Sequence, residues 1–319
     1  MDKAVRIAAV IINYKTPDLT LAAVRSLYMQ MDAQRDAIFV VDNCSDDGSL
    51  EILREAFANE AWPGRIELLA SDRNGGFSYG NNFAMCRVDA EAYLLLNSDA
   101  ELDPDALSMM WDALQAEPRR GLVGPLMHGD DGALQHSCFV DRSPWSEFLA
   151  TAKTGVLTRL FENFGVREVA SQAPGGEARD VDWLSFVCVM IRGETFRDVG
   201  PMDDGYFMYR EDNDYSRRAR QKGWSVYYQP QASAMHLNKG WSGKELARQP
   251  AFYYESRARY FRKFYGFLGF LSANLLWTLG RMIRRPRELL QGRPTSVAIS
   301  AWRDIWTMRV GNKPLTREV

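Results

Sequence analysis

Carboxylate side chains follow two of the apolar runs in this chain. Asp42 comes directly after residues 38–41, and Asp99 follows the run 93–96 with two residues, Asn97 and Ser98, between them. A hard divalent cation prefers oxygen ligands and keeps waters or substrate phosphates in its shell, so one such carboxylate and a diphosphate can begin a metal site. An aspartate at a strand end is also a common helix cap. The spacing of Asp99 leaves both interpretations open.

A second group of carboxylates, at residues 211–214, opens a predicted helix. It follows an aromatic loop, residues 206–209. The helix dipole favours carboxylates in a first turn, so capping alone accounts for Glu211 and Asp212. Next to a partly dry cavity lined by the aromatic loop, one of them would instead serve as a general base.

His236 is one of three histidines in the chain. The preceding strand is expected to end near Gln229, which places His236 in a polar loop over residues 235–241. A lone histidine usually has a structural role. The alternative is that His236 and a carboxylate converge on one cation.

Two common nucleotide-binding motifs and two cysteine motifs are absent. A dinucleotide-binding fold would place Gly-x-Gly-x-x-Gly directly after the first strand, but residues 13–17 are Asn-Tyr-Lys-Thr-Pro. A P-loop is absent too, and the glycine-rich segment at 74–80 follows the third strand instead. The four cysteines are isolated, so neither a zinc site nor a redox motif is indicated. Any nucleotide must bind by another scheme.

An alternation of predicted strands and helices positions these residues. Apolar runs rich in β-branched residues are typical of strands buried on both faces of a sheet. Their alternation with segments of helical spacing predicts an α/β fold with a mainly parallel central sheet and helices on both faces. In such a sheet, ligands bind beyond the carboxyl ends of the strands. The strands are expected at residues 5–12, 38–41, 66–70, 92–96, 122–123, 186–191 and 225–229.

Length and composition are those of a globular protein. A chain of 319 residues with 46% hydrophobic and 25% charged residues is neither disordered, collagen-like nor a coiled-coil rod. We expect a catalytic domain over residues 1–250 and a helical appendage over 251–319. Residues 141–180 break the alternation and predict a partly helical insert with a mobile end. The first residues lead directly into a strand without a signal-peptide core, so we expect a cytoplasmic protein.

The two parts of the chain carry opposite charge. Residues 1–250 carry a balance of −11 and residues 251–319 one of +9, which argues against nucleic acid as a partner of the whole and for an anionic surface as partner of the tail. Residues 264–280 are uncharged, but a spanning helix usually needs about 20 residues. We expect residues 251–287 to lie on the membrane surface. The alternative is a helix pair packed on the catalytic domain or in a homodimer interface.

Taken together, these segments resemble the nucleotide-sugar glycosyltransferases of family 2, which have the GT-A fold, and within them the bacterial rhamnosyltransferase-like branch. The resemblance covers about residues 5–245. It is carried by the end of the first strand, by Asp-Asn-Cys-Ser-Asp-Asp-Gly-Ser at 42–49, by the glycine-rich segment at 74–82, by Leu-Asn-Ser-Asp at 96–99, by Glu-Asp at 211–212 and by His236.

The resemblance implies a role for each segment. Asp212 would be the general base, with Glu211 beside it in the catalytic pair. Asp99, in the position of the family's D-x-D motif, and His236 would bind Mg²⁺ or Mn²⁺. The residues implied in binding the nucleotide-sugar donor are Asn13, Tyr14, Asp42, Asn74, Gly75, Gly76, Asn82, Asn97 and Ser98. Those implied near the acceptor are Trp183, Phe186 and Tyr209.

Three features depart from the wider family. Asn97 stands where the D-x-D motif has its first aspartate, and the rhamnosyltransferase-like branch often shows this variant. Phe186 stands where relatives commonly have glycine, so a bulky ring would reshape the acceptor pocket. The Gln-x-x-Arg-Trp motif of processive polysaccharide synthases is absent, so a polymer-extruding synthase is not expected.

The implied reaction is an inverting, metal-dependent sugar transfer at the inner face of the cell membrane. The favoured donor is deoxythymidine-diphosphate rhamnose, and the acceptor is a lipid-linked or cell-surface glycan of polysaccharide biosynthesis. A second hypothesis is the same chemistry with a uridine-diphosphate hexose or galactofuranose. A third is a catalytically silent homologue that binds nucleotide or glycan in an assembly complex, which only Asn97 and Phe186 favour.

Overall fold

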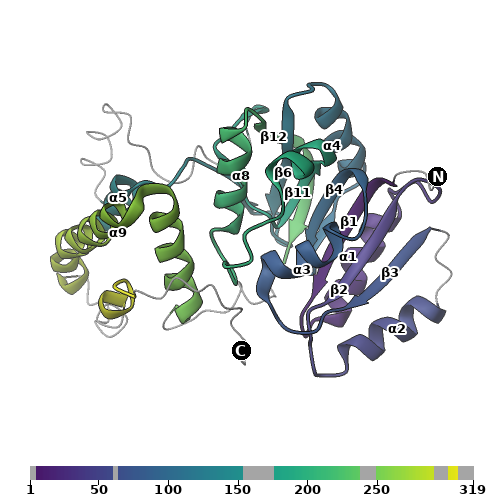
Figure 1. Ribbon diagram of the computed structural model, residues 1–319, viewed down its shortest axis with the longest axis horizontal. Helices are drawn as coiled ribbons and strands as arrows, with labels where there is room; N and C mark the ends of the chain where they lie inside the picture. Colours follow the sequence, from purple (N-terminus) through teal and green to yellow (C-terminus); the bar gives the residue numbers. More distant parts are fainter. Residues whose placement is uncertain (1–4, 60–63, 154–175, 238–248, 291–300, 308–319) are drawn as a thin grey trace.

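The computed structural model describes residues 5–59, 64–153, 176–237, 249–290 and 301–307 (Figure 1). Of the insert expected over 141–180, residues 154–175 lie outside the described residues, as does the end of the loop expected over 235–241. The described chain forms an α/β body with a group of helices from the insert and the tail at one side (Figure 1).

A ten-stranded sheet organises the body. Its order is β3-β2-β1-β4-β11-β6-β12-β5, with β7 (Leu134–Gln135) paired to β6 and β9 (Arg179–Asp180) paired to β12. The pairs among β3, β2, β1 and β4 are parallel, as is β6 with β12, whereas β11 and β5 run antiparallel to their neighbours. This confirms the expected mainly parallel sheet. The strands of this path are β1 Val5–Asn13, β2 Ala37–Asp42, β3 Arg65–Ala70, β4 Ala90–Asn97, β5 Ala100–Leu102, β6 Arg120–His128, β11 Cys188–Arg192 and β12 Ser225–His236.

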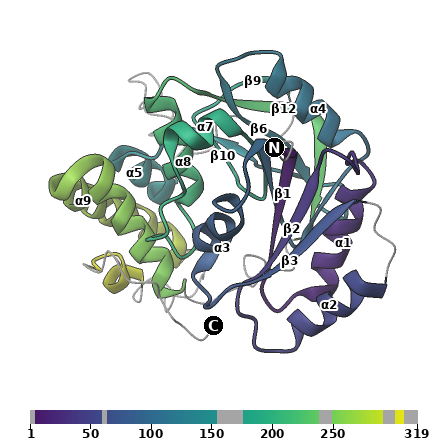
Figure 2. The same cartoon turned by 45° about the vertical axis from the view of Figure 1, so that its right-hand side comes forward.

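Helices cover both faces of the sheet. Successive residues of a strand point to opposite faces, so Ile38 and Val40 pack with α1, α2 and α4, while Phe39 and Val41 pack with α3, α7 and α8. Figure 2 shows α1 and α2 on one side of the first strands and α3 on the other. The helices are α1 Pro17–Tyr28, α2 Ser49–Asn59, α3 Gly76–Met85, α4 Ala106–Gln115, α7 Gly193–Val199 and α8 Glu211–Gln221.

Strand β12 corrects one expectation from the sequence. The predicted strand end near Gln229, with His236 in a polar loop, is wrong. The strand continues to His236, which pairs with Ala100 of β5. Its register against β6 shifts between Gln229 and Ser233. This irregularity interrupts the alternation of side chains, so the sequence pattern ends although the strand does not.

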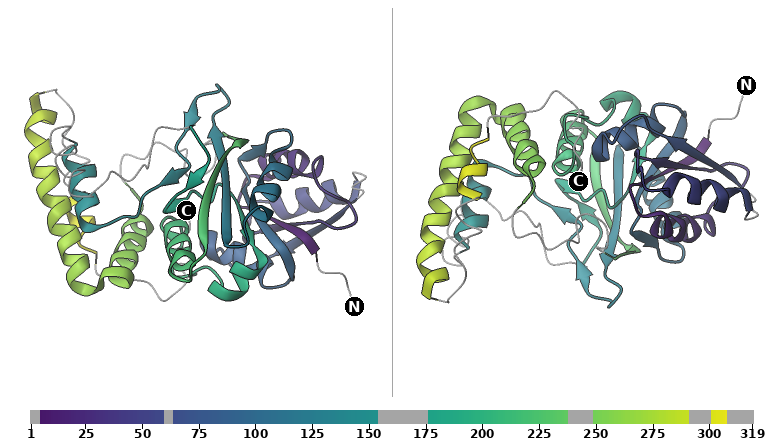
Figure 3. Two further views of the ribbon diagram at one scale, coloured as in Figure 1. Left: turned by 90° about the horizontal axis from the view of Figure 1, so that it is seen from above. Right: turned by 90° about the horizontal axis from the view of Figure 1, so that it is seen from below.

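The insert and the tail form a helical layer beside the body. The insert contributes α5 (Pro144–Ala152) and the tail contributes α9 (Ala251–Leu290). At Gly266 φ is 68° and ψ is −172°, outside the helical range, so α9 consists of two helices that meet at an angle (Figure 3). The second half packs against α5, where a Cβ on Gly280 would lie 2.7 Å from the carbonyl oxygen of Phe148. Only glycine permits this approach.

The second half of α9 also has an exposed apolar face. Its large exposed side chains include Phe267, Leu268, Leu275, Leu279, Met282 and Ile283. Within the described residues, no helix combines the length and the apolar character needed to cross a membrane.

Candidate active site

A cavity of about 360 Å³ opens where β1 and β4 end. The residues after these strands line it together with the glycine-rich loop, the aromatic loop and the start of α8. Because parallel strands end at the same edge of the sheet, these segments meet although they are far apart in sequence. The predicted site residues that line the cavity are Tyr14, Asn74, Gly76, Asn97, Ser98, Asp99, Phe186, Tyr209, Glu211, Asp212 and His236.

Strand pairing brings Asp99 and His236 together. Asp99 lies in the turn between β4 and β5, and His236 ends β12, which pairs with β5. The Nε2 atom of His236 lies 3.6 Å from Oδ1 of Asp99, and its Nδ1 atom lies 3.0 Å from Oε1 of Gln135. The amide nitrogen of Gln135 donates to the carbonyl oxygen of His236, which fixes the amide orientation. Since Oε1 only accepts, Nδ1 carries a proton, and in the neutral imidazole Nε2 then presents a lone pair towards Asp99.

This pair has the chemistry of a divalent cation site. Nε2 of His236 is buried and has no hydrogen-bond partner among the described residues, and Asp99 is 4% exposed. A neutral imidazole oriented by a second hydrogen bond is a usual metal ligand. The described part of the chain holds no cluster of three or more His, Cys, Asp or Glu residues. A cation held here would therefore draw further oxygen ligands from a bound diphosphate or water.

Glu211 and Asp212 stand at the start of α8, directly after the aromatic loop. Burial, together with the adjacent Asp212, raises the pKa of Glu211 well above its ordinary value. Burial also raises the pKa of Asp212 to about 6, against the opposing hydrogen bond from the Asn213 amide at 2.7 Å. A carboxylate with this pKa is mostly ionised at neutral pH yet is a stronger base than an exposed one. Asp212 therefore suits the role of a general base.

The glycine-rich loop directly contacts the aromatic loop. Gly76 has a φ of 83°, and a Cβ there would lie 2.0 Å from the carbonyl oxygen of Phe207. The Phe77 amide donates to that same oxygen at 2.8 Å. The Asn74 side chain accepts from the Gly76 amide at 3.1 Å, and Gly75 is the N-cap residue of α3. Glycine at position 76 is therefore required for two sides of the cavity to meet.

Four residues expected to bind the donor, Asn13, Asp42, Gly75 and Asn82, lie beside the cavity rather than in its lining. Nδ2 of Asn13 donates to Oδ1 of Asp42 at 2.7 Å, and Asp42 also accepts from the hydroxyl and amide of Ser45. Asp42 is 3% exposed, so its carboxylate holds the turn after β2. The side-chain amide of Asn82 donates to the carbonyl oxygen of Met202 and accepts from the Met202 amide.

The three residues expected near the acceptor differ in position. Phe186 and Tyr209 line the cavity. Trp183 does not line it, because its ring stacks on Phe139 with centroids 4.1 Å apart and its Nε1 donates to the Val140 carbonyl. Trp183 thus joins the two segments of the chain that flank the insert.

The tail contributes a cavity residue that no sequence pattern indicates. Phe252 of α9 lines the cavity and stacks on Tyr209 with ring centroids 6.1 Å apart. Nearby, the Ser256 hydroxyl donates to the Met208 carbonyl at 2.9 Å. Like the contact of Gln135 with His236, this packing depends on tertiary structure alone.

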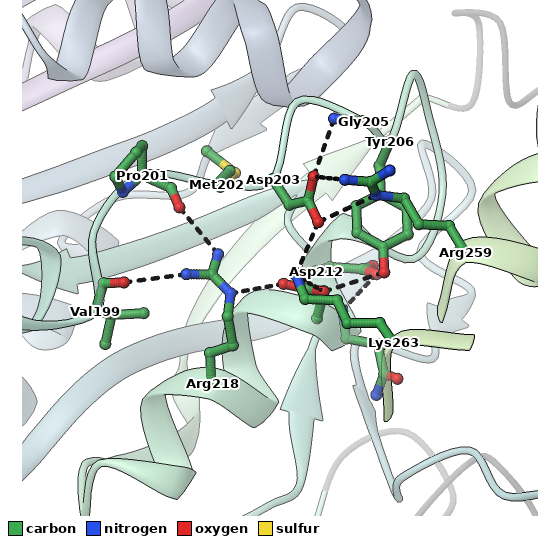
Figure 4. Close-up of polar contacts among 12 residues, drawn as sticks. Val199, Pro201, Met202, Asp203, Gly205, Tyr206, Asp212, Arg218, Arg259 and Lys263 are labelled. Carbon is green, nitrogen blue, oxygen red and sulfur yellow. Dashed lines mark hydrogen bonds and ion pairs between the residues drawn. The ribbon is translucent and has the colours of Figure 1, made fainter. Parts of the chain in front are cut away.

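Ion pairs join the tail helix to the aromatic loop and to α8 (Figure 4). Nζ of Lys263 lies 2.8 Å from Oδ2 of Asp203 and 2.6 Å from Oδ2 of Asp214. Arg259 pairs with Asp203 at 2.6 Å. Burial alone would raise the pKa of Asp203, but its bonds to Arg259 and Lys263 lower it to about 2. The Tyr206 hydroxyl donates to Asp214 at 3.0 Å. The first half of α9 is thus fastened to α8, which carries the candidate base, and to Asp203 before the aromatic loop.

Residues 8–137 match the family model of glycosyl transferase family 2. A protein of Mycobacterium tuberculosis described as N-acetylglucosaminyl-diphospho-decaprenol L-rhamnosyltransferase is 26% identical over 259 residues, which are 76% of this chain and 79% of that protein. The low-salt glycan biosynthesis hexosyltransferase Agl10 of Haloferax volcanii is 24% identical over 72% of this chain and 66% of its own length.

Two solved structures share the fold over nearly the whole chain. GalNAc-T7, solved with UDP, GalNAc and Mn²⁺, gives a TM-score of 0.61 at 14% identity and covers 95% of this chain and 55% of that one. The mannosyltransferase PcManGT of Pyrobaculum calidifontis, solved with GDP-Man and Mn²⁺, gives 0.56 at 14% identity and covers 94% and 79%. At these identities the likeness concerns the fold.

Proposed function

The chain is a glycosyltransferase with a family 2 domain, a GT-A fold and a rhamnosyltransferase-like sequence, and we propose that it transfers L-rhamnose from deoxythymidine-diphosphate rhamnose to a hydroxyl group of a lipid-linked glycan. One observation carries the proposal: a single cavity is lined by the Asp99–His236 pair and by the carboxylate of Asp212. The description of the Mycobacterium tuberculosis relative supports the sugar and the acceptor class.

The donor binds with its diphosphate at Asp99 and His236 in this proposal. These two residues would hold Mg²⁺ or Mn²⁺, because a buried lone pair of His236 faces a buried carboxylate. Such a cation offsets the negative charge that develops on the leaving diphosphate. The Asn97 amide and the Ser98 hydroxyl would bond the nucleotide sugar, because both residues line the same cavity. The two solved structures that contain a nucleotide also contain Mn²⁺.

Asp212 accepts the proton of the acceptor hydroxyl. The oxygen then attacks the anomeric carbon from the face opposite the diphosphate, so the configuration inverts. General-base help of this kind is worth about 10²–10⁴-fold in rate. The aromatic side chains of Phe207, Tyr209 and Phe252 line the cavity near this carboxylate and limit the access of water.

The acceptor reaches the cavity from a membrane surface. The second half of α9 exposes an apolar face, and Arg281, Arg284 and Arg285 stand on the same segment. An exposed apolar helix face with basic residues binds anionic lipid surfaces. We therefore place the enzyme on the inner face of the cell membrane, with its catalytic domain over residues 1–250 and the tail as anchor.

A donor screen tests the proposed function. The purified chain is incubated with deoxythymidine-diphosphate rhamnose, uridine-diphosphate hexoses and uridine-diphosphate galactofuranose, each with Mg²⁺, with Mn²⁺ or with EDTA, and nucleotide release is measured. We expect the rhamnose donor to be consumed fastest and EDTA to stop the reaction.

Three other outcomes of the donor screen would change the proposed function. Faster consumption of a uridine-diphosphate sugar would replace the donor but keep the chemistry. Absence of binding and turnover with every donor would end the transferase assignment and favour a silent homologue. Full activity in EDTA would remove the metal from the mechanism.

A further inference from the structure

A cluster of buried arginines lies beside the start of α8, where the insert, the catalytic segment and the tail meet. It consists of Arg142, Arg210 and Arg257, gathered around the carboxylate of Glu147 on α5. Nε of Arg257 lies 2.8 Å from Glu147, Nη1 of Arg142 lies 3.4 Å away and Nη2 of Arg210 lies 3.9 Å away. Burial alone would raise the pKa of Glu147, but the charges of Arg257 and Arg142 hold it below its ordinary value. One carboxylate therefore faces three guanidinium groups.

The cluster has unmatched donors. Nε of Arg142 and Nη2 of Arg257 are buried without a hydrogen-bond partner among the described residues. The Arg210 side chain is 6% exposed, and its ionic contact with Glu147 is long. Buried charge without a counter-charge is costly, so a cluster with more cations than anions is suited to an anionic ligand.

The cluster adjoins the catalytic end of the cavity. Arg210 directly precedes Glu211, and both Tyr209 and Arg210 have positive φ, 71° and 75°. This left-handed pair of residues is strained, and such strain is often stored at ligand sites. Beside Arg142, the Asp141 carboxylate accepts from Nδ2 of Asn213, the neighbour of Asp212, at 3.4 Å. The positive charge of Arg142 also opposes the rise in the pKa of Asp212. At 22% exposure, the Arg142 side chain is the most accessible of the three.

We propose that Arg142 and Arg210 form a subsite for a phosphate group of the acceptor, next to Asp212. Planar guanidinium groups match phosphate oxygens in charge and geometry. Arg257, which also donates to Oδ1 of Asn274 at 2.5 Å, holds Glu147 and so positions the other two. The inference rests on the proposed transfer to an acceptor hydroxyl. It adds that the acceptor carries a phosphate group near that hydroxyl. The subsite lies on the acceptor side and is separate from the diphosphate position at Asp99 and His236.

Direct binding without turnover tests the subsite. The full chain, saturated with deoxythymidine diphosphate and Mn²⁺ to occupy the donor site, is titrated calorimetrically with geranyl phosphate and with geraniol. We expect geranyl phosphate to bind and geraniol to bind at least about tenfold more weakly, because a charge-assisted bond is lost. Arg142→Gln and Arg210→Gln should each lower the affinity for geranyl phosphate about tenfold, and the affinity of Arg142→Lys should be intermediate.

Matched variants separate binding from folding. Arg119→Gln removes an arginine that packs on the Trp224 ring outside the cavity lining, and it should leave binding unchanged. Thermal melts report whether each variant folds. If Arg210→Gln does not fold, the affinity of Arg142→Gln, a change at the more exposed position, decides whether the subsite exists. Equal binding of geraniol and geranyl phosphate, or unchanged affinity in Arg142→Gln, would overturn the subsite. Inorganic phosphate binding as tightly as geranyl phosphate would overturn its assignment to the acceptor. Because no donor is turned over, failure here is distinct from failure of the donor screen.

Discussion

Lys263 of the tail helix pairs with Asp214 at 2.6 Å, two residues beyond Asp212 on α8. The Asp214 side chain is 1% exposed, and the same lysine also contacts Asp203 before the aromatic loop. The tail thus supports the active site as well as presenting an apolar face. Deleting residues 251–319 would remove Phe252 from the cavity, so single substitutions are the better tests.

Lys263→Met should reduce catalysis more than donor binding. Without the lysine, Asp203 and Asp214 lose the cation that both contact, and small displacements near the chemistry can lower rates strongly. We expect kcat to fall about tenfold with little change in the donor KM. Lys263→Arg should restore most of the rate. Lys222→Met, which removes an exposed lysine paired with Asp198 at the other end of α8, is the control. A change in thermal stability alone, with kcat intact, would make the contact purely structural.

Asp212→Asn should remove the base and stabilise the fold. We expect turnover to fall about 10²–10⁴-fold with nucleotide affinity nearly intact, measured by calorimetry and donor consumption. In the native enzyme, kcat/KM should fall below pH 6, where Asp212 becomes protonated.

The stability effect of the same substitution has a defined sign. Folding raises the pKa of Asp212 from 3.8 to about 6, so its stabilising contribution is present below pH 3.8 and is lost as the pH rises through 6. Asp212→Asn should therefore melt higher than the native protein at pH 8, with no gain at pH 4. Equal melting temperatures at both pH values would contradict the buried carboxylate.

Gln135→Leu should weaken the binding of Mn²⁺, because it removes the side chain that orients His236. The substitution removes the acceptor that fixes the proton on Nδ1. Loss of such a supporting bond typically costs about 10–100-fold in metal affinity, so the Mn²⁺ concentration for half-maximal donor hydrolysis should rise by that factor. His128→Gln is a matched control, because His128 pairs with Asp103 at 2.8 Å outside the cavity lining. An unchanged Mn²⁺ titration would remove His236 from the cation site.

Gly76→Ala should damage both stability and activity. The left-handed backbone alone costs about 1–2 kcal/mol for a residue with a side chain, and the new Cβ would collide with the Phe207 carbonyl. We expect a lower melting temperature and a higher donor KM. Gly48→Ala serves as control, since Gly48 also has positive φ but has open space around it. If the two variants behave alike, the contact with Phe207 has no special weight.

Leu275→Glu and Leu279→Glu should abolish flotation with anionic liposomes. Both side chains are exposed on the second half of α9, and a charge there opposes insertion into the headgroup region. Donor hydrolysis in solution should be unchanged, because this half of the helix is remote from the cavity lining. Met29→Glu is the control, because it replaces an exposed apolar side chain elsewhere with the same charged one. Flotation of all three variants like the native chain would end the membrane assignment.

Much of the fold could be predicted because its signals are local. Buried strands and amphipathic helices leave periodic patterns in sequence, and the ends of parallel strands share one edge of the sheet. These two rules suffice to gather Tyr14, Asn74 and Asp99 at one edge of the sheet. They do not reveal that β11 inserts antiparallel between β4 and β6, or that β12 continues past its irregularity to His236.

Contacts between distant segments could not be predicted from the sequence. Phe252 and Gln135 are ordinary residues until α9 packs on the aromatic loop and β7, Leu134–Gln135, pairs with β6. Asp42 shows the converse, since its motif is prominent yet its carboxylate is occupied by Asn13 and Ser45. A motif identifies a residue type, but only packing decides what its polar atoms face.

The carbonyl oxygen of Phe207 is shared by the two sides of the cavity: it accepts from Phe77, on the proposed donor side, and belongs to the loop that holds Tyr209, on the proposed acceptor side. In kinetic terms, the two substrates of the proposed reaction would not meet independent halves of the enzyme. Displacing this one peptide group should change the apparent affinities for donor and acceptor together. The lines of a double-reciprocal plot should then intersect away from the vertical axis, at a distance from it that the coupling between the two loops sets.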